Sequence, residues 1–351
     1  MTETIQPVDD SHTTPSYIGQ IDIALTTTKN GEITHVSITN SRPKNMGRLL
    51  IGKTPQQALM VIPKLFSLCS QAQQAAAISA ISALENKPLS TTQKTEMAER
   101  CALEWLKEHS WQLWQMEREL FGENFAIKES LALSRFLLKQ LQDESSSAAS
   151  RYSAPVNEFL NTLFGCKPST FTGFSWQELL KWSEGQAPYA KLFQALQLNG
   201  VCRLGAFKSW HISDEDGPLS RQRKHPLLIS AMKLWGASVA TRTLARLIEI
   251  VEVSLNPEIS LSTQQGVAFA SRGTLTHQIT TDSNGLISHY TIDAPTDRYF
   301  SLGGLVKKSL IGQQIPNMAS KWIRQLIWAI DPCIEFTVTV NQIVTDTQKE
   351  S

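Results

Sequence analysis

Residues 67–84 read SLCSQAQQAAAISAISAL, a stretch in which alanine recurs without an internal proline or glycine. Alanine has the highest intrinsic helix propensity, so the stretch predicts an α-helix. Side chains this small let another helix approach closely, and we expect this helix to be part of a helical core. Pro63 should disturb the helix that precedes it, and Pro88 should end the segment.

Further helices are expected on both sides of this stretch. Thr54 with Gln57, and Ser90 with Gln93, have the spacing of capping boxes, which begin helices. Apolar residues then recur at helical spacing. Helices are expected from residue 54 onward and over residues 90–122, 126–142, 226–254 and 322–330, with short amphipathic helices between residues 155 and 200.

Alternating apolar and polar residues mark strands near both ends of the chain. Residues 17–39 alternate around an Asn-Gly pair at 30–31, and residues 275–292 around a second Asn-Gly pair at 284–285. Asn-Gly tolerates the positive φ angles of tight turns, so each stretch predicts a β-hairpin. Residues 334–340 alternate as a terminal strand. The expected fold class is α+β, mainly helical, with small β elements near both ends.

The composition is that of a globular protein and excludes several classes of partner. Hydrophobic residues make up 41% of the 351 residues, and 33 basic residues balance 32 acidic ones, leaving a formal charge of +1. That balance argues against general binding to nucleic acid or to an acidic membrane surface. No apolar run approaches the roughly 20 residues that span a bilayer. We therefore expect neither nucleic acid nor membrane as a partner.

The organisation expected is one domain over residues 17–344 with a tail at each end. Residues 1–16 are predicted to be a flexible tail, residues 345–351 a polar tail, and residues 143–150 an exposed Ser-rich loop. The N-terminus lacks the basic start and apolar core of a secretory signal. The cysteines are five in number and widely spaced, which favours a cytoplasmic protein with free thiols.

No single motif in the chain defines a site. Cysteines and histidines do not cluster with the spacing of a zinc site. Cys69 with Gln73 at i+4 is an ordinary pair on a core helix, and Cys333 lies between a helix end and a strand, where functional groups are often presented. His277 alternates with apolar neighbours and would ordinarily face solvent. The basic run at residues 221–225 would ordinarily be a solvated loop.

The order of several short segments adds information that none of them carries alone. Taken together, they resemble the large subunits of nickel–iron hydrogenases and cover residues 19–339. The resemblance implies a large-subunit-like core. The matching segments are residues 52–59, residues 63–73 (PKLFSLCSQAQ, like PRxCGxCxxxH), residues 217–221 (GPLSR, like GPLAR), residues 271–277 (SRGTLTH, like PRGxxGH) and residues 331–333 (DPC, like the start of DPCxxCxxH).

The chain departs from that family at the metal ligands. The family holds nickel and iron with four thiolates, whereas here Cys69 and Cys333 match one cysteine of each pair and Phe66 and Phe336 replace the others. By the resemblance, Cys69 takes the place of a bridging ligand and Cys333 that of a terminal ligand. Nickel in a thiolate site needs soft sulfur ligands, so no nickel and no hydrogen-splitting enzyme are expected. The family's two histidines and its N-terminal acidic residue fall at Gln73, Thr339 and Gly47.

This pattern is similar to that of the HupK/HoxV-type accessory proteins, which resemble degenerate hydrogenase large subunits and assist hydrogenase maturation. The resemblance implies a scaffold that transiently holds iron with two cyanides and one carbonyl, with Cys69 and Cys333 as metal ligands. Arg272 would reach the cyanide nitrogens, and His277 would orient a loop or a sulfur. The implied partners are HypC–HypD-type maturation proteins as the source of the fragment and the hydrogenase large subunit as its recipient.

Three alternatives stay open from the sequence. A metal-free chaperone that mimics the large subunit would tolerate serine at both Cys69 and Cys333. An active redox metalloenzyme would need further ligands from Cys101, Cys166 or Cys202. The last alternative is an unrelated fold that matches the family by chance.

Overall fold

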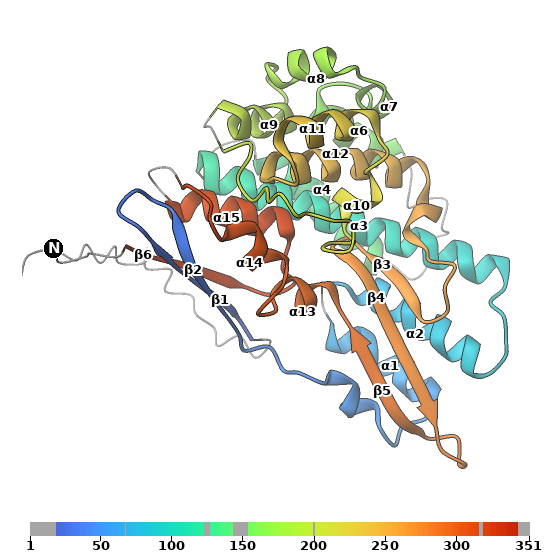
Figure 1. The fold of residues 1–351 in the computed structure, drawn as a ribbon. Coiled ribbons are helices and arrows are strands. Elements are labelled where there is room, and N and C mark those ends of the chain that lie inside the picture. The colour runs from blue at the N-terminus through green and yellow to red at the C-terminus, as the bar shows by residue number, and fades with distance from the viewer. Residues whose placement is uncertain are drawn as a thin grey trace, which may run out of the picture.

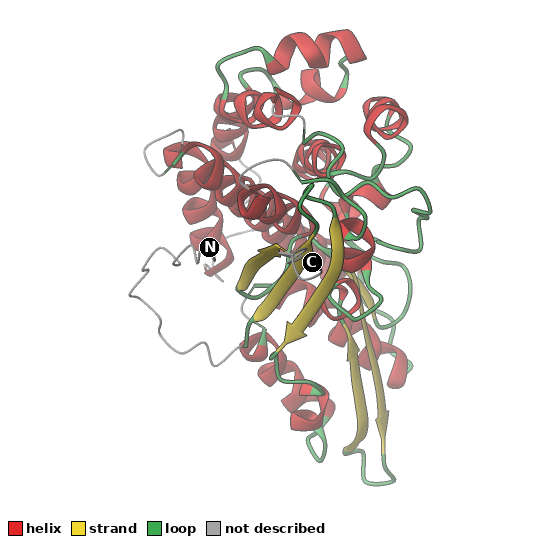
Figure 2. Ribbon diagram, turned by 60° about the vertical axis from the view of Figure 1, so that its left-hand side comes forward, coloured by secondary structure: helices red, strands yellow, loops and turns green. Residues whose placement is uncertain are grey.

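A computed structural model describes residues 19–66, 68–122, 127–142, 154–198, 201–315 and 319–342. The chain folds into a mainly helical body with two small three-stranded sheets, which confirms the expected fold class. The strands lie below most of the helices in both views (Figures 1 and 2). The predicted tails at 1–16 and 345–351 and the predicted loop at 143–150 lie outside the described residues.

The first sheet joins the two ends of the chain. It consists of β1 (Ile21–Thr27), β2 (Ile33–Asn40) and β6 (Phe336–Gln342), in the order β2-β1-β6. β1 pairs antiparallel with β2 as the predicted hairpin, and parallel with β6 in a register that sets Ile21 opposite Phe336. This pairing brings the segment just before β6 back beside the start of the described chain.

The second sheet contains the other predicted hairpin. It consists of β3 (Val267–Ala270), β4 (Gly273–Thr281) and β5 (Ile287–Asp293), in that order and antiparallel throughout. β3 was not expected from the sequence. The β4–β5 hairpin extends away from the helical body (Figure 1), and the turn between β3 and β4 lies beneath the helices.

The alanine-rich helix packs mainly on this second sheet. α2 (Ser70–Leu84) begins three residues later than predicted, with Cys69 as its N-cap residue. The small side chains of Ala72 and Ala76 contact Ala268 and Leu275 of the sheet. The sequence predicted a helix as the partner of these small side chains, but they pack against a sheet as well as against neighbouring helices.

Most of the remaining helices form the body above the sheets, whereas the helical segments at residues 46–50 and 55–65 lie beside the β4–β5 hairpin (Figure 1). The capping boxes predicted at Thr54 and Ser90 are both present. The longer helices are α3 (Thr91–Phe121), α4 (Ile127–Gln142), α12 (Val239–Leu255) and α15 (Ala319–Ile330). The shorter ones are η1 (Met46–Leu50), α1 (Pro55–Leu65), α6 (Ala154–Phe164), α7 (Pro168–Thr172), α8 (Trp176–Ser183), α9 (Pro188–Leu198), α10 (Pro218–Arg221), α11 (Pro226–Trp235), η2 (Pro257–Ser260), α13 (Pro295–Tyr299) and α14 (Leu305–Leu310).

The single helix predicted over residues 226–254 is wrong. The structure has α11 and α12 instead, separated at Gly236, whose φ of 66° lies in the left-handed region. The Ser238 hydroxyl then accepts the backbone N–H of Thr241 and starts α12 afresh. Apolar residues continue across the break, so periodicity alone did not reveal it. None of the described helices is long and apolar enough to cross a membrane.

Candidate metal centre

The four residues singled out from the sequence lie at the meeting point of three chain segments. Cys69 is at the N-terminus of α2, Cys333 is in the loop between α15 and β6, and Arg272 is in the turn between β3 and β4. The Arg272 charge lowers the pKa of Cys69, and the sulfurs of Cys69 and Cys333 raise the pKa of Arg272. His277 follows on β4 and joins the group through Gln73.

Cys69 is a protonated thiol at neutral pH in the metal-free protein. Its pKa is raised to about 12, mainly by burial and in addition by the nearby Cys333 and Glu104. Arg272 and a hydrogen bond from Gln73 act in the opposite direction. A thiol must lose its proton to bind a metal, so a metal cation here would take the place of that proton.

A chain of hydrogen bonds ties His277 to the Cys69 sulfur. The Tyr290 hydroxyl lies 2.8 Å from Nδ1 of His277, and Nε2 of His277 lies 2.8 Å from Oε1 of Gln73. The Gln73 Nε2 donates to the Cys69 Sγ at 3.7 Å. An amide oxygen only accepts, so Nε2 of His277 carries the proton and Nδ1 accepts from the tyrosine.

His277 is therefore a buried, neutral residue. Only 2% of it is exposed, which corrects the solvent-facing interpretation. Burial lowers the pKa of His277 to about 3, so the ring stays uncharged at neutral pH. Gln73, at the position of the family's first histidine, takes part in orienting the sulfur. Sequence spacing placed Gln73 beside Cys69 but gave no sign of its link to His277.

Arg272 is held in a buried position by two carboxylates. Its Nη2 donates to the Glu108 Oε2 at 2.6 Å, and its Nε lies 3.1 Å from the Asp331 Oδ1. Burial lowers the pKa of Arg272, but these carboxylates more than offset that effect and hold the pKa above its ordinary value. Among the described residues, the remaining nitrogen, Nη1, has only a long contact of 3.5 Å to the Ser271 hydroxyl. One edge of the guanidinium is thus left with donor capacity.

Glycine is required beside Arg272 by both its backbone angle and its surroundings. Gly273 has a φ of 154°, and a Cβ placed on it would lie 2.4 Å from the Asp216 Oδ1. Any larger residue would push this turn out of place. The Arg-Gly pair in the motif at residues 271–277 therefore has a geometric reason.

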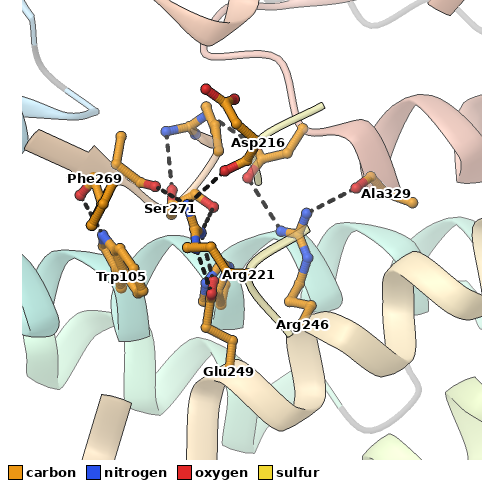
Figure 3. A network of polar contacts seen from close by, with 12 residues as sticks. Trp105, Asp216, Arg221, Arg246, Glu249, Phe269, Ser271 and Ala329 are labelled. Carbon is orange, nitrogen blue, oxygen red and sulfur yellow. Dashed lines mark hydrogen bonds and ion pairs between the residues drawn. The ribbon is translucent and has the colours of Figure 1, made fainter. Parts of the chain in front are cut away.

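A second buried ion pair fixes the same turn from the other side. Arg221 lies between Glu249 and the carbonyl of Ser271 (Figure 3), donating at 2.7 Å to each Glu249 oxygen and at 2.9 Å to the carbonyl. The guanidinium lies 4.3 Å from the centre of the Trp105 ring. The solvated-loop interpretation of residues 221–225 is wrong for Arg221, because the chain folds this side chain inward.

Cys333 is positioned by the residues that precede it and by α13. Asp331 ends α15 with a positive φ of 69°, and its second oxygen lies 3.2 Å from Nη1 of Arg246 on α12. The Cys333 backbone N–H donates to the Thr296 hydroxyl at 3.3 Å. The loop carrying Cys333 is thus held by interactions with two different helices.

Several residues of the site had not been predicted. Arg42, just after β2, donates its Nη1 to the Cys333 Sγ at 3.3 Å and lies 5.7 Å from the centre of the Phe66 ring. No local pattern singles out Arg42. Glu104 and Glu108 could have been noticed in the sequence, because both interrupt the apolar face of α3 at i,i+4 spacing. Both are buried in the structure. Glu104 accepts the backbone N–H groups of Gln71 and Ala72 at the start of α2.

The described residues offer two sulfur donors and little else for a metal. Phe66 and Phe336, which the resemblance sets in the places of two thiolates, are 6% and 7% exposed. No group of three or more His, Cys, Asp or Glu residues within the described ranges is arranged to hold a metal ion. A metal bound here would take two ligands from this part of the chain, and its other ligands would have to come with it.

Comparison with solved structures identifies the class of fold. The Ni-Fe-Se hydrogenase from D. vulgaris Hildenborough aligns with 87% of this chain and 94% of its own, with a TM-score of 0.56 and 12% identity. The reduced, active Ni-Fe-Se hydrogenase from Desulfomicrobium baculatum gives the same values. The chain has the fold of a nickel–iron hydrogenase large subunit.

Sequence relatives narrow the comparison to accessory proteins. The hydrogenase expression/formation protein HupV of Azotobacter chroococcum mcd 1 is 26% identical over 346 residues, covering 92% of this chain and 98% of the relative. HupK of Azotobacter vinelandii is 25% identical over 342 residues, covering 89% and 96%. No family model matches the chain. The predicted resemblance to large-subunit-like hydrogenase accessory proteins is confirmed along nearly the whole chain.

Proposed function

We propose that this protein acts in the formation of nickel–iron hydrogenase, as a non-catalytic scaffold that transiently holds iron carrying two cyanides and one carbonyl. The observation that carries the proposal is the meeting of Cys69 and Cys333 with Arg272 in a large-subunit fold. The names of the HupV and HupK relatives support a role in hydrogenase formation.

The donor set suits iron that brings its own ligands. Two cyanides and a carbonyl fill three positions, and the two thiolates would fill two more. Thiolates are soft ligands that suit such an iron. The free edge of Arg272, at Nη1, would donate to a cyanide nitrogen, which is an anionic acceptor. A nickel ion would lack two thiolates of the family's set, so nickel is not proposed.

The scaffold would receive its cargo from one protein and pass it to another. We propose HypC–HypD-type maturation proteins as the source and the hydrogenase large subunit as the recipient. A holder with only two protein ligands can release iron to a site that has more of them. The five free cysteines suit the reducing cytoplasm, where this transfer is proposed to take place.

A metal-free chaperone that mimics the large subunit is the second candidate. It is favoured by Phe66 and Phe336, whose buried rings take the places of two ligands. The two candidates differ in what they require of the cysteines. The iron scaffold needs both sulfurs, whereas the chaperone needs only the shape of the protein.

Hydrogenase activity in cells distinguishes these candidates. The native gene would be replaced by the Cys69→Ser, Cys333→Ser or Cys202→Ser variant, and hydrogen uptake would be measured at equal amounts of accessory protein. Cys202 is the matched control, because it is a partly exposed cysteine outside the site. Loss of activity with the first two variants alone supports the scaffold. Full activity with all three variants would overturn it in favour of the chaperone.

A further inference from the structure

A cleft of about 860 Å³ opens on the surface next to Cys333. The segment from β2 to η1 forms one wall, and β5 and the region after α13 form the other. Arg42 and Phe66 line the cleft, and Arg42 also touches the Cys333 sulfur at 3.3 Å. The inner part of this cleft therefore lies one side chain away from the candidate metal centre.

The cleft is positively charged and has apolar walls. Arg42, Lys44 and Arg48 line it, against a single carboxylate from Asp297. Within the described residues, neither Lys44 nor Arg48 pairs with an acidic side chain. Apolar walls are provided by Ile38, Phe66, Ile292 and Phe300. A cleft lined by one sign of charge between low-dielectric walls concentrates ions of the opposite sign.

Arg42 holds a position between the cleft and the sulfur. Its Nη1 lies 3.3 Å from the Cys333 Sγ and 3.6 Å from the Asp297 Oδ1. The Arg42 side chain is only 11% exposed, whereas that of Asp297 is 51% exposed. The guanidinium thus has an inner partner, which is the sulfur, and an outer partner on the rim. Arg42 is thus the cleft-lining side chain that also contacts the Cys333 sulfur.

We propose that the cleft is an entry path for anions and that Arg42 is the residue that selects them for Cys333. This deepens the proposed function and rests on it only for the natural ligand, an iron complex with negatively charged cyanide groups. Arg42 would contact the cyanides as they enter, while Arg272 would contact them once the iron is bound. The shared chemistry is a guanidinium that donates hydrogen bonds to an anionic acceptor.

Two alkylating reagents test anion selection without any iron. Iodoacetate is anionic and iodoacetamide is neutral. They transfer a carboxymethyl and a carbamoylmethyl group, respectively, to a thiolate, and iodide leaves. The ratio of their rates at one cysteine cancels the fraction of thiolate, since both reagents need it. Mass spectrometry of the folded protein would give this ratio for Cys333 and, as internal references, for the partly exposed Cys166 and Cys202.

We expect the rate with iodoacetate divided by the rate with iodoacetamide to be roughly tenfold higher at Cys333 than at Cys166 and Cys202. Tenfold is the low end of the rate effects of charged clefts. Arg42→Gln should remove most of the excess, Arg42→Lys should retain part of it, and Asp297→Asn should increase it. Lys181→Gln on α8 is the control, because it removes one charge far from the cleft. Added salt should lower the excess in the wild-type protein.

Two results would overturn the inference. One is an unchanged ratio in both Arg42→Gln and Asp297→Asn. The other is no reaction of Cys333 with either reagent while Cys202 reacts, because the cleft would then not lead to the sulfur. Asp297 is exposed and its replacement should fold normally, so the test does not depend on Arg42→Gln alone. Neither result bears on whether iron binds, so failure here is separable from failure of the scaffold.

Discussion

The Oδ1 of Asp331 lies 3.1 Å from the Nε of Arg272, and this ion pair joins the two loops that carry the candidate metal centre. Asp331 precedes Cys333 by two residues, and its other oxygen pairs with Arg246 on α12. All three charged groups are nearly fully buried. The loops are therefore held in place before any cargo arrives, which lowers the cost of ordering them on binding.

Replacing Asp331 with asparagine should destabilise the protein strongly. Asparagine tolerates the positive φ, so the main change is the loss of charge between two buried guanidiniums. Removing one partner from a buried ion pair costs about 3–5 kcal/mol. The free energy of unfolding from denaturant titration measures this loss.

Asp293→Asn provides the matched control for that substitution. Asp293 pairs with Arg298 at 2.7 Å, but its side chain is 58% exposed. An exposed pair contributes at most about 1 kcal/mol. Equal losses of unfolding free energy in the two variants would show that burial does not make the Asp331 ion pair more stabilising than an exposed pair.

Gln73 is predicted to tune the bound iron through the Cys69 sulfur. Gln73→Leu removes the N–H that donates to the sulfur at 3.7 Å and leaves His277 without its acceptor. The sulfur should then donate more electron density to iron, and the iron should pass more of it to the carbonyl. We expect the carbonyl stretch to move to lower wavenumber and iron affinity to fall by roughly tenfold. Infrared spectroscopy and an iron competition titration measure the two effects.

Gln278→Leu is the control for the Gln73 substitution. Gln278 lies on β4 next to His277 and is exposed. Its replacement should leave both the carbonyl band and the affinity unchanged. A band that shifts equally in both variants would mean that the link from His277 through Gln73 to Cys69 does not act on the iron.

Glu117 predicts a pH dependence of stability that is independent of the metal. It lies on α3 with 1% exposure, and burial raises its pKa to about 8 from 4.5. Between these values the folded state holds more protons than the unfolded state, so the free energy of unfolding falls as pH rises. With 1.36 kcal/mol per pKa unit, the fall is on the order of a few kcal/mol.

Glu117→Gln should remove this part of the pH dependence, because glutamine resembles the neutral acid. The variant should match the wild-type protein below the unfolded pKa of 4.5 and exceed its stability increasingly as the pH rises to about 8. Glu158→Gln on α6, an exposed position, should show no such difference. Thermal unfolding across this pH range measures the effect, and parallel curves for wild type and Glu117→Gln would contradict the assignment.

Local features of the fold could be predicted because their causes lie within a few residues. The capping boxes at Thr54 and Ser90 and the two Asn-Gly turns are of this kind. The break at Gly236 and the parallel pairing of β6 with β1 were not predicted. The pairing depends on contacts between opposite ends of the chain, for which no short sequence pattern exists.

The candidate metal centre also contains residues that could be predicted from the sequence and residues that could not. Cys69, Cys333, Arg272 and His277 followed from motif order, and the structure brings them together. Arg42 did not, because its partner Cys333 lies 291 residues away along the chain. The contact of Arg272 with Glu108 joins residues 164 positions apart and likewise could not be predicted from the sequence. Ligand candidates could be named from the sequence, whereas the charges that surround them required the fold.

The most direct test of the iron scaffold is an infrared spectrum of the protein purified without oxygen from cells with an active hydrogenase maturation system. Carbonyl and cyanide bound to a metal absorb where protein is transparent. An iron scaffold should show carbonyl and cyanide bands in the wild-type protein and in Cys202→Ser, and these bands should be absent in Cys69→Ser and Cys333→Ser. Bands that persist in both site variants, or their absence from the wild-type protein while hydrogenase still matures with both variants, would contradict it.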